Sequence, residues 1–557
     1  MVHRCLLVPE LFRLVCEVLT HGYKTRPSSV QWLVTLASLA RTCRAFEGPA
    51  LDVLWHDIEG LRPLLCTMPS DLFEMKAKDS RFNVLVWLRI QIYVSGIILI
   101  LSDPKCLRRP ILLSDLTRLP SYAQRIRKVH VGSKSFVDVE VLQALSMATL
   151  HMKPLLPNLE DLSWYYGHIT KKVEWSMFQC IYLFFSPKLT TLSITLYNTL
   201  DSACPPSILS GLLNSCPALK NLTFLFRSSN SKSRRDISSV ICQWNWLQSL
   251  TVNDLTQEAL KHLATISSLR TLSLNSLEDL TRSYDQHLPI VMRNPTSGYP
   301  ALQISSISCR TMDAAIAFVQ LLSSSPVENL DIQVVDLCYP RQWRELFHTI
   351  SRHIYHSSLE ELILQESGNA LDPPKALYSD IGLEALTVFT NLQDVDIQPT
   401  FGIQLTSDTV NRLADAWPKI CHLELGNTYP SSRSPIIKTE DLTPFAQRCP
   451  KLEYLGIVFD AQNVQLRSSP GLFNNTLTTL SVADSPINAP VIVSAFLSDI
   501  FPRIESIIFE NNWRGSPDRD PEDTTEAAMM WGKAERLLQE FAKVRLQERS
   551  RMEMRYN

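Results

Sequence analysis

The sequence is poor in glycine and contains none of the common catalytic motifs. It has 16 glycines among 557 residues, whereas phosphate-binding loops are usually glycine-rich. G-x-G-x-x-G, Walker-type, G-x-S-x-G and H-E-x-x-H motifs are all absent. His348, His353 and His356 lie close together in the sequence, and we interpret them as ordinary surface or boundary histidines rather than metal ligands. We therefore expect a protein that is not an enzyme and has neither a cofactor nor a metal site.

The sequence also lacks any pairing pattern among its cysteines. The number of cysteines is odd, 13, and no two form a C-x-x-C pair, which indicates free thiols in a reducing compartment rather than a disulfide framework. The apolar run that begins at Cys5 is interrupted by Glu10, Arg13 and Glu17, so it does not predict a secretory signal. We expect an intracellular protein, cytoplasmic and/or nuclear.

An excess of charge of either sign is missing as well. The chain has 54 Lys and Arg residues against 56 Asp and Glu residues, a formal net charge of −2. This balance does not favour binding to nucleic acid or to an acidic membrane surface. The basic residues Lys232, Arg234 and Arg235 stand in a serine-rich stretch, for which a solvated loop is the expected structure.

One sequence motif recurs about fourteen times along the chain. It consists of an apolar residue, two polar residues, an apolar residue, one polar residue and an apolar residue, and it usually follows a proline. Clear copies are 157–164, 187–194 and 217–224. Successive copies between Ile126 and Ile504 begin 22 to 33 residues apart. Self-similarity at such a period predicts a solenoid, in which neighbouring repeats bury each other's apolar faces.

Each repeat combines a helical piece with a short strand. The final alternation of apolar and polar residues predicts a parallel strand with its apolar side chains inward. A period near 29 with helical outer segments resembles the leucine-rich repeats of the ribonuclease-inhibitor type, which implies an α/β solenoid in the form of a horseshoe. Where that consensus has Asn or Cys after the motif, this chain has Arg227, Leu255, Leu277 or Ser367. We therefore expect an irregular ladder of hydrogen bonds beside the strands.

The first 66 residues predict a compact unit of three helices. Three segments of this unit resemble, in the same order, the three conserved motifs of the F-box family: Val8–Leu11, Leu39–Phe46 and Pro49–Trp55. The unit departs from the family pattern because it lacks the spacer residue after Pro9 and has a long first loop. Together with the repeats, these segments resemble F-box proteins with C-terminal leucine-rich repeats of the type common in mushroom-forming fungi. The fold class that follows is a leucine-rich-repeat solenoid preceded by a small all-α, F-box-like domain.

The F-box resemblance implies a docking surface for another protein. More apolar residues are present in this unit than three short helices can bury among themselves, and in the F-box family such residues bind the Skp-type adaptor of a cullin ubiquitin ligase. The alternative is that they only pack against the repeats. The candidate adaptor-binding residues are Pro9, Leu11, Val15, Leu36, Leu39, Cys43 and Trp55.

Residues 67–120 form a predicted connector with an unusual apolar run at 84–101. Arg89 interrupts this run, and a central arginine in a membrane span costs about 2.5 kcal/mol or more, so we do not expect a span. A buried helix or strand and a translated intron both remain open as interpretations.

The polar side of the strands is the second candidate surface. Strand side chains alternate between the two faces, so the positions around the second leucine of each motif point away from the core. They are small and neutral in the early repeats and acidic later, which favours a target protein with Lys- or Arg-bearing segments. A merely solvated face would have a similar composition. The candidate target-binding residues are Asp331, Glu361, Asp394, Asp396 and Glu424.

The repeats are predicted to span 121–511, and residues 512–557 to form a linker and a helix. That helix is expected to cap the last repeat, with a partner-binding helix as the alternative. The function that follows is the substrate receptor of a Skp–cullin–F-box ubiquitin ligase. The alternative is a leucine-rich-repeat scaffold or inhibitor without a role in ubiquitin transfer.

Overall fold

The computed structural model describes most of the chain. The described residues are 8–21, 30–77, 102–132, 137, 139–150, 154–166, 176–196, 206–226, 231–277, 298–323, 325–367, 381–426, 434–465, 473–509 and 526–556. The chain divides into two compact units, Met1–Ala259 and Leu260–Asn557.

The first unit begins with three helices: α1 (Pro9–His21), α2 (Val30–Ala40) and α3 (Arg44–Leu54). Pro9 is the first residue of α1, where its missing N–H costs no hydrogen bond. The rings of Phe12 and Phe46 stack with their centroids 3.9 Å apart, which joins α1 to α3. After α3, Trp55 is 5% exposed and packs on Tyr122, with ring centroids 4.7 Å apart.

A short antiparallel hairpin lies within the predicted connector. Its strands are β2 (Phe73–Ala77) and β3 (Ser102–Leu107), and the apolar run 84–101 lies outside the described residues. The remaining elements here are β1 (Asp57–Glu59), α4 (Arg62–Leu65), η2 (Ser70–Leu72), η3 (Leu113–Leu116) and α6 (Leu119–Ala123).

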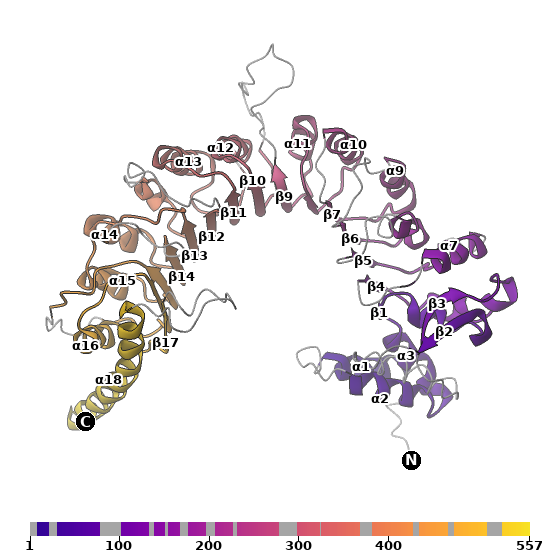
Figure 1. The fold of residues 1–557 in the computed structure, drawn as a ribbon, viewed down its shortest axis with the longest axis horizontal. Coiled ribbons are helices and arrows are strands. Elements are labelled where there is room, and N and C mark those ends of the chain that lie inside the picture. The colour runs from indigo at the N-terminus through magenta and orange to yellow at the C-terminus, as the bar shows by residue number, and fades with distance from the viewer. Residues whose placement is uncertain are drawn as a thin grey trace, which may run out of the picture. The chain divides into compact units, whose positions relative to one another are not determined.

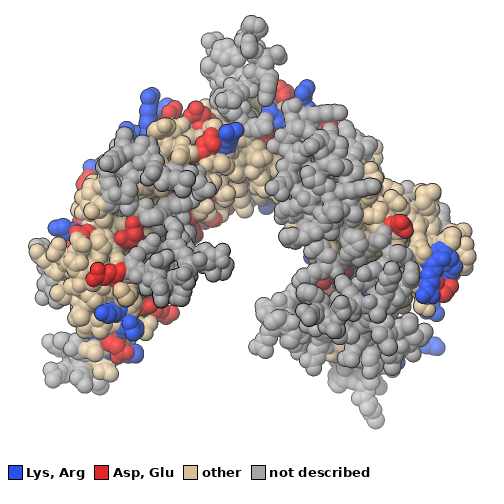
Figure 2. Space-filling view, in the orientation of Figure 1, with Lys and Arg blue, Asp and Glu red and all other residues tan. Residues whose placement is uncertain are grey.

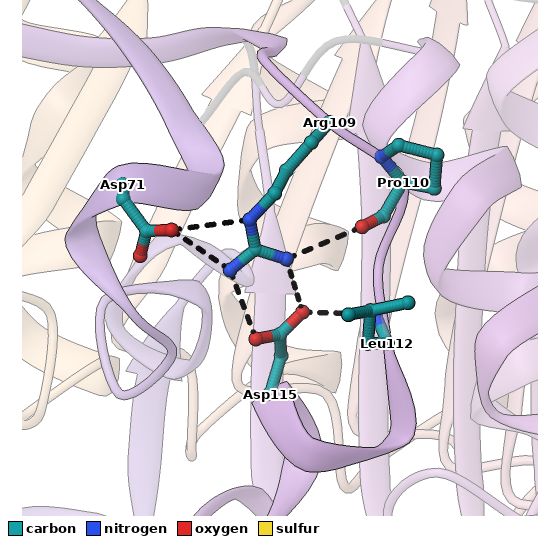
Figure 3. A network of polar contacts seen from close by, with 5 residues as sticks. All are labelled: Asp71, Arg109, Pro110, Leu112 and Asp115. Atoms are coloured by element: carbon teal, nitrogen blue, oxygen red, sulfur yellow. Dashed lines mark hydrogen bonds and ion pairs between the residues drawn. The ribbon is translucent and has the colours of Figure 1, made fainter.

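One arginine ties the two flanks of this hairpin together. Figure 3 shows the Arg109 guanidinium between the carboxylates of Asp71, at 2.9 Å, and Asp115, at 2.7 Å. The backbone N–H of Leu112 also donates to Asp115, at 2.8 Å. The hydrogen bond from Arg109, followed by that from Leu112, lowers the pKa of the Asp115 carboxyl. The flanks of the hairpin are therefore held by charge-assisted hydrogen bonds.

The repeats of the first unit pair in chain order. The strand order is β1-β4-β5-β6-β7-β8, with all pairs parallel. These strands are β4 (Lys128–Val131), β5 (Asp161–Tyr166), β6 (Thr191–Leu196), β7 (Asn221–Phe226) and β8 (Ser249–Val252). Their helices are α7 (Val139–Ala148), η5 (Ile181–Phe184), α9 (Pro206–Ser215) and α10 (Ser231–Ile241). Because β1 pairs with β4, the helical domain runs directly into the first repeat.

The expectation of a solvated basic loop near residue 232 is wrong. These residues belong to α10, and Arg234 donates to the buried carboxylate of Asp254 at 3.0 Å. Serine has a low helix propensity, which is why the sequence predicted a loop. Packing between repeats overrides that preference, since Ile237 and Val240 of the same helix are buried.

The second unit continues the same pattern with nine parallel strands. They are β9 (Thr271–Leu277), β10 (Ile304–Cys309), β11 (Asn329–Val334), β12 (Glu361–Glu366), β13 (Asp394–Gln398), β14 (His422–Leu425), β15 (Tyr454–Ile457), β16 (Thr479–Ala483) and β17 (Ser506–Phe509). The helices between repeats are α11 (Gln257–Leu263), α12 (Met312–Leu321), α13 (Pro340–His353), η7 (Leu383–Val388), α14 (Ser407–Ala416), η8 (Thr439–Leu442), α15 (Thr443–Arg448) and α16 (Pro490–Ile500). In Figure 1, α12 to α16 lie on one side of these strands.

Fifteen parallel strands in chain order, flanked by helices, are those of a leucine-rich-repeat solenoid. The motif leucines form its core. In β12, for example, Leu362 and Leu364 are fully buried, while Glu361 and Gln365 are partly exposed. The predicted fold class is confirmed.

The hydrogen bonds beside the strands come from irregular positions. In the second unit, the buried carboxylate of Glu366 accepts the backbone N–H of Cys338 at 2.7 Å and that of Thr400 at 3.1 Å. Elsewhere Asn253 accepts from Phe226 N–H at 2.8 Å. These side chains satisfy backbone groups that the consensus Asn would otherwise bond.

Replacing Glu366 with alanine should lower the free energy of unfolding by about 2 kcal/mol or more, because two buried N–H groups lose their acceptors. Urea unfolding of the full chain measures this. Glu345→Ala, at an exposed position on α13, is the control and should change stability by less than about 0.5 kcal/mol. Equal midpoints for the two variants would show that Glu366 has no such role.

The chain ends in a long helix, α18 (Glu526–Tyr556), which packs on α16 and β17. Trp531 is 1% exposed, and its Nε1 donates to the carbonyl oxygen of Ser485 at 2.8 Å. Further along, Arg545 forms an ion pair with Asp499 at 2.8 Å. The N-terminal half of α18 therefore covers the core of the last repeat. No helix among the described residues is long and apolar enough to cross a membrane.

Candidate binding surfaces

Helix α1 is apolar on two sides. Phe12 and Cys16 face the core and are buried. A second stripe, at three-, four- and seven-residue spacing, faces outward. We call it the α1 outer face; it consists of Leu11, Leu14, Val15 and Val18, with exposed fractions of 46%, 56%, 43% and 70%. Residues at this spacing lie on one side of a helix, so the four side chains form one continuous apolar surface.

The seven candidate adaptor-binding residues separate into two groups. Pro9, Leu11, Val15 and Cys43 are exposed, and Leu39 is half-buried. In contrast, Leu36 is fully buried and Trp55 is 5% exposed.

Leu36 and Trp55 can therefore influence a partner only by supporting the helices. The outward-facing residues Leu14 and Val18 are absent from the seven candidates. Their three- and seven-residue spacing from Leu11 is a signal that could have identified them.

The strand face of the second unit carries carboxylates in adjacent rows. Parallel pairing places Asp394 opposite Glu361 on one side and His422 on the other. Asp396 lies opposite Glu424. No Lys or Arg occurs in any strand from β9 to β17. The five candidate residues thus come from four consecutive repeats, β11 to β14, and four of them cluster on β12 to β14.

Hydrogen bonds fix several of these carboxylates. Asp396 accepts from the side-chain amides of Gln365 at 2.7 Å and Gln398 at 2.8 Å. The carboxylate of Glu424 lies 3.5 Å from Nε2 of His422 and 3.4 Å from the hydroxyl of Tyr454.

Asp331 and Glu361 have partners of their own. Asp331 accepts from Ser306 at 2.9 Å, and Glu361 accepts from the amide of Asn329. The imidazole of His422 stacks on the ring of Tyr454 with centroids 4.2 Å apart. The strand face is therefore a preorganised set of acceptors.

Partial burial changes the acid–base behaviour of this face. Burial raises the pKa of Asp331, Asp394 and Asp396. Burial acts to lower the pKa of His422, but its hydrogen bond with Glu424 and the surrounding carboxylates outweigh that effect and raise it. The carboxylates are poorly solvated as anions, so a neighbouring cation would stabilise their charged form.

The described residues contain no group of three or more His, Cys, Asp or Glu side chains arranged to hold a metal ion. His353 is paired through Nδ1 with the Ser323 hydroxyl at 2.5 Å, and His356 through Nε2 with the Ser351 carbonyl at 2.7 Å. These two histidines have local partners.

The strand face of the first unit is different in character. From β5 to β8 its partly exposed positions are mostly Ser, Thr and Asn, with Asp161 and Tyr165 on β5. On the described part of the face seen in Figure 2, basic and acidic side chains are interspersed among other residues, and neither sign dominates. The acidic character is therefore a local property of a few repeats in the second unit.

No family model matches the chain, and no curated protein matches it. Among solved structures 68 chains match. One is a chain in the crystal structure of the LRIM1/APL1C complex, with 14% sequence identity and a TM-score of 0.27. The match covers 74% of this chain and 60% of that chain. The assignment of the fold to the leucine-rich-repeat solenoids rests on the strand order and repeat pattern described above.

Proposed function

We propose that this protein is the substrate-recognition subunit of a Skp–cullin–F-box ubiquitin ligase. Its N-terminal helices would bind the Skp-type adaptor, and its solenoid would bind the target protein. The observation that supports this most directly is the α1 outer face. Four large apolar side chains stand exposed on one helix of a small domain whose sequence phrases resemble the F-box.

An exposed apolar stripe of this kind indicates a protein contact. These side chains are 43–70% exposed, so burying the rest of each against a partner would contribute about 0.7–2 kcal/mol per side chain. Contiguous apolar patches on soluble proteins commonly mark interaction sites. The inner face of α1 is already occupied by its packing on α3, so the outer face is available for an adaptor.

The role of such a receptor is to position the target protein. The chain has no catalytic motif, and the ligase's other subunits would transfer ubiquitin. The receptor would raise the effective concentration of the target at the transfer site and orient it there.

Co-expression of the full chain with a Skp-type adaptor tests the proposal. A complex that persists through affinity purification and gel filtration is expected. A folded chain that forms no complex with the adaptor would overturn the ubiquitin role. Solenoid proteins often hold partners without any such role, so a chain that captured a target but no adaptor would be a scaffold or inhibitor instead.

The acidic strand face predicts a preference for basic target segments. The double substitution Asp394→Lys and Asp396→Lys should weaken binding of a fluorescent oligolysine peptide by about tenfold or more, since it replaces attraction with repulsion. Fluorescence anisotropy measures this. Asp408→Lys with Asp415→Lys, on α14, makes the same change in net charge at exposed helical positions and is the control.

The same binding should weaken on acidification. Carboxyl groups with raised pKa values take up protons at a higher pH than ordinary ones, and protonated His422 adds positive charge. Affinity should therefore fall between about pH 7.5 and about pH 5. Equal affinity for the acidic-face variant and the α14 control would exclude these carboxylates from binding.

A further inference from the structure

Directly after β11 the chain forms an exposed loop, residues 335–339, which we call the edge loop. Val335 is 49% exposed, Leu337 40% and Tyr339 61%. Between them, Asp336 is half-buried and Cys338 is buried. Three large apolar side chains therefore stand at alternate positions on the surface.

The backbone of the edge loop is held from three sides. The N–H of Val335 donates to the Cys309 carbonyl at 3.0 Å, and that of Asp336 to the Arg310 carbonyl at 2.8 Å. The N–H of Cys338 donates to Glu366 of β12.

A fourth contact to the edge loop comes from the following helix, α13. The N–H of Tyr339 donates to the Gln342 side chain of α13 at 2.9 Å. Because the edge loop is already ordered, binding a partner would not carry the free-energy cost of ordering the loop's backbone.

The edge loop continues the acidic strand face. Asp331, Gln333 and Val335 are alternate residues, so they point to the same side of β11 and its extension. Neighbouring strands add two aliphatic residues to this side. Ile304 of β10 is 45% exposed, and Ile363 of β12 is partly exposed and lies opposite Asp331.

The carboxylate of Asp331 lies on this side. Oδ2 accepts from Ser306 at 2.9 Å, and the Gln333 side chain is a further hydrogen-bond donor to the carboxylate. Both partners are neutral, so a cationic side chain placed beside Asp331 would be attracted to it.

We propose that this edge surface, made of Ile304, Asp331, Ile363, Val335, Leu337 and Tyr339, binds a protein segment in which a large apolar residue stands next to lysine or arginine. The apolar residue would pack on Leu337 and Tyr339, since exposed tyrosines on rigid loops are effective contact residues. The cation would donate to Asp331. An acidic segment would be repelled by Asp331, and the exposed Arg310 beside the loop is paired with Asp336 at 3.5 Å.

The proposal rests on the proposed function only in assigning target binding to the second unit. It needs no adaptor. It deepens that function by requiring two chemical features of the target segment at once, an apolar side chain and a positive charge.

The test uses the full chain and a short fluorescent peptide that alternates arginine with leucine and phenylalanine. Two related peptides replace either the arginines with glutamate or the apolar residues with serine. Fluorescence anisotropy should show that each replacement weakens binding by about tenfold or more. Binding of the serine peptide as tightly as the first would overturn the proposal.

A pair of chain variants locates the site. The double substitution Leu337→Ser and Tyr339→Ser should lower the affinity for the first peptide by a similar factor. The control, Val388→Ser with Ile436→Ser, alters exposed apolar residues elsewhere in the unit and should leave that affinity unchanged. Unchanged binding by the edge-loop variant would overturn the proposal. Adaptor co-purification should be intact in both variants; its absence from every form of the chain would contradict the ligase role alone.

Discussion

Replacement of Leu14 and Val18 with aspartate is expected to weaken adaptor binding by about 100-fold or more. The two side chains are 56% and 70% exposed, so the substitutions should leave the folded chain intact. In the complex, the variant would lose the burial of two aliphatic groups and place two charges against an apolar surface. Isothermal titration of the full chain with a Skp-type adaptor gives the affinities.

Two comparisons make that result specific. Met147→Asp with Leu150→Asp changes apolar residues of similar exposure at the end of α7 and should bind the adaptor as the unchanged chain does. Leu36→Ala, in the core of the helical domain, should instead lower the melting temperature. If the Leu14 and Val18 variant binds with full affinity, the α1 outer face is not the docking surface.

Replacement of Trp531 with alanine should lower the free energy of unfolding of the second unit by about 3–5 kcal/mol. The indole is buried against Phe459, with ring centroids 5.9 Å apart, and bonded to the Ser485 carbonyl. Its loss leaves a cavity and an unsatisfied carbonyl beneath α18. Because neighbouring repeats stabilise one another, loosening the cap should destabilise the repeats next to it.

Urea unfolding followed by circular dichroism measures this effect. Met529→Ala, on the same helix but 55% exposed, is the matched control and should shift stability by less than about 0.5 kcal/mol. Hydrogen exchange should show faster exchange in β16 and β17 of the Trp531 variant. Protection equal to that of the unchanged chain would mean that α18 does not stabilise the last repeats.

The strands could be predicted from the sequence because their signal is local. Each motif alternates apolar and polar residues over a few positions, as in Leu192 and Ile194 of β6, and that period alone defines which side is buried. The acidic face followed from the same alternation. The three-residue strand β1 is too short to give a period, and its partner β4 begins about 70 residues later.

Contacts that depend on distant residues were not predictable. Glu366 bonds backbone groups 28 and 34 residues away, and nothing beside it in the sequence indicates this. Leu36 and Trp55 were assigned to a binding surface because apolar residues look alike in a sequence, whether a fold buries them or a partner does. The packing of α2, and of Trp55 on Tyr122, places both in the core.

The entry of β1 into the sheet has a mechanical consequence within the first unit. The N–H groups of Arg127 and Lys128 donate to the His56 carbonyl at 3.0 and 2.9 Å, and Arg125 bonds both Asp52 and the Gly48 carbonyl of α3. Among the described residues, these hydrogen bonds join the helical domain directly to the first repeats. A force applied to α1 would therefore be transmitted to β4. A partner bound to α1 would fix the orientation of the first repeats relative to itself.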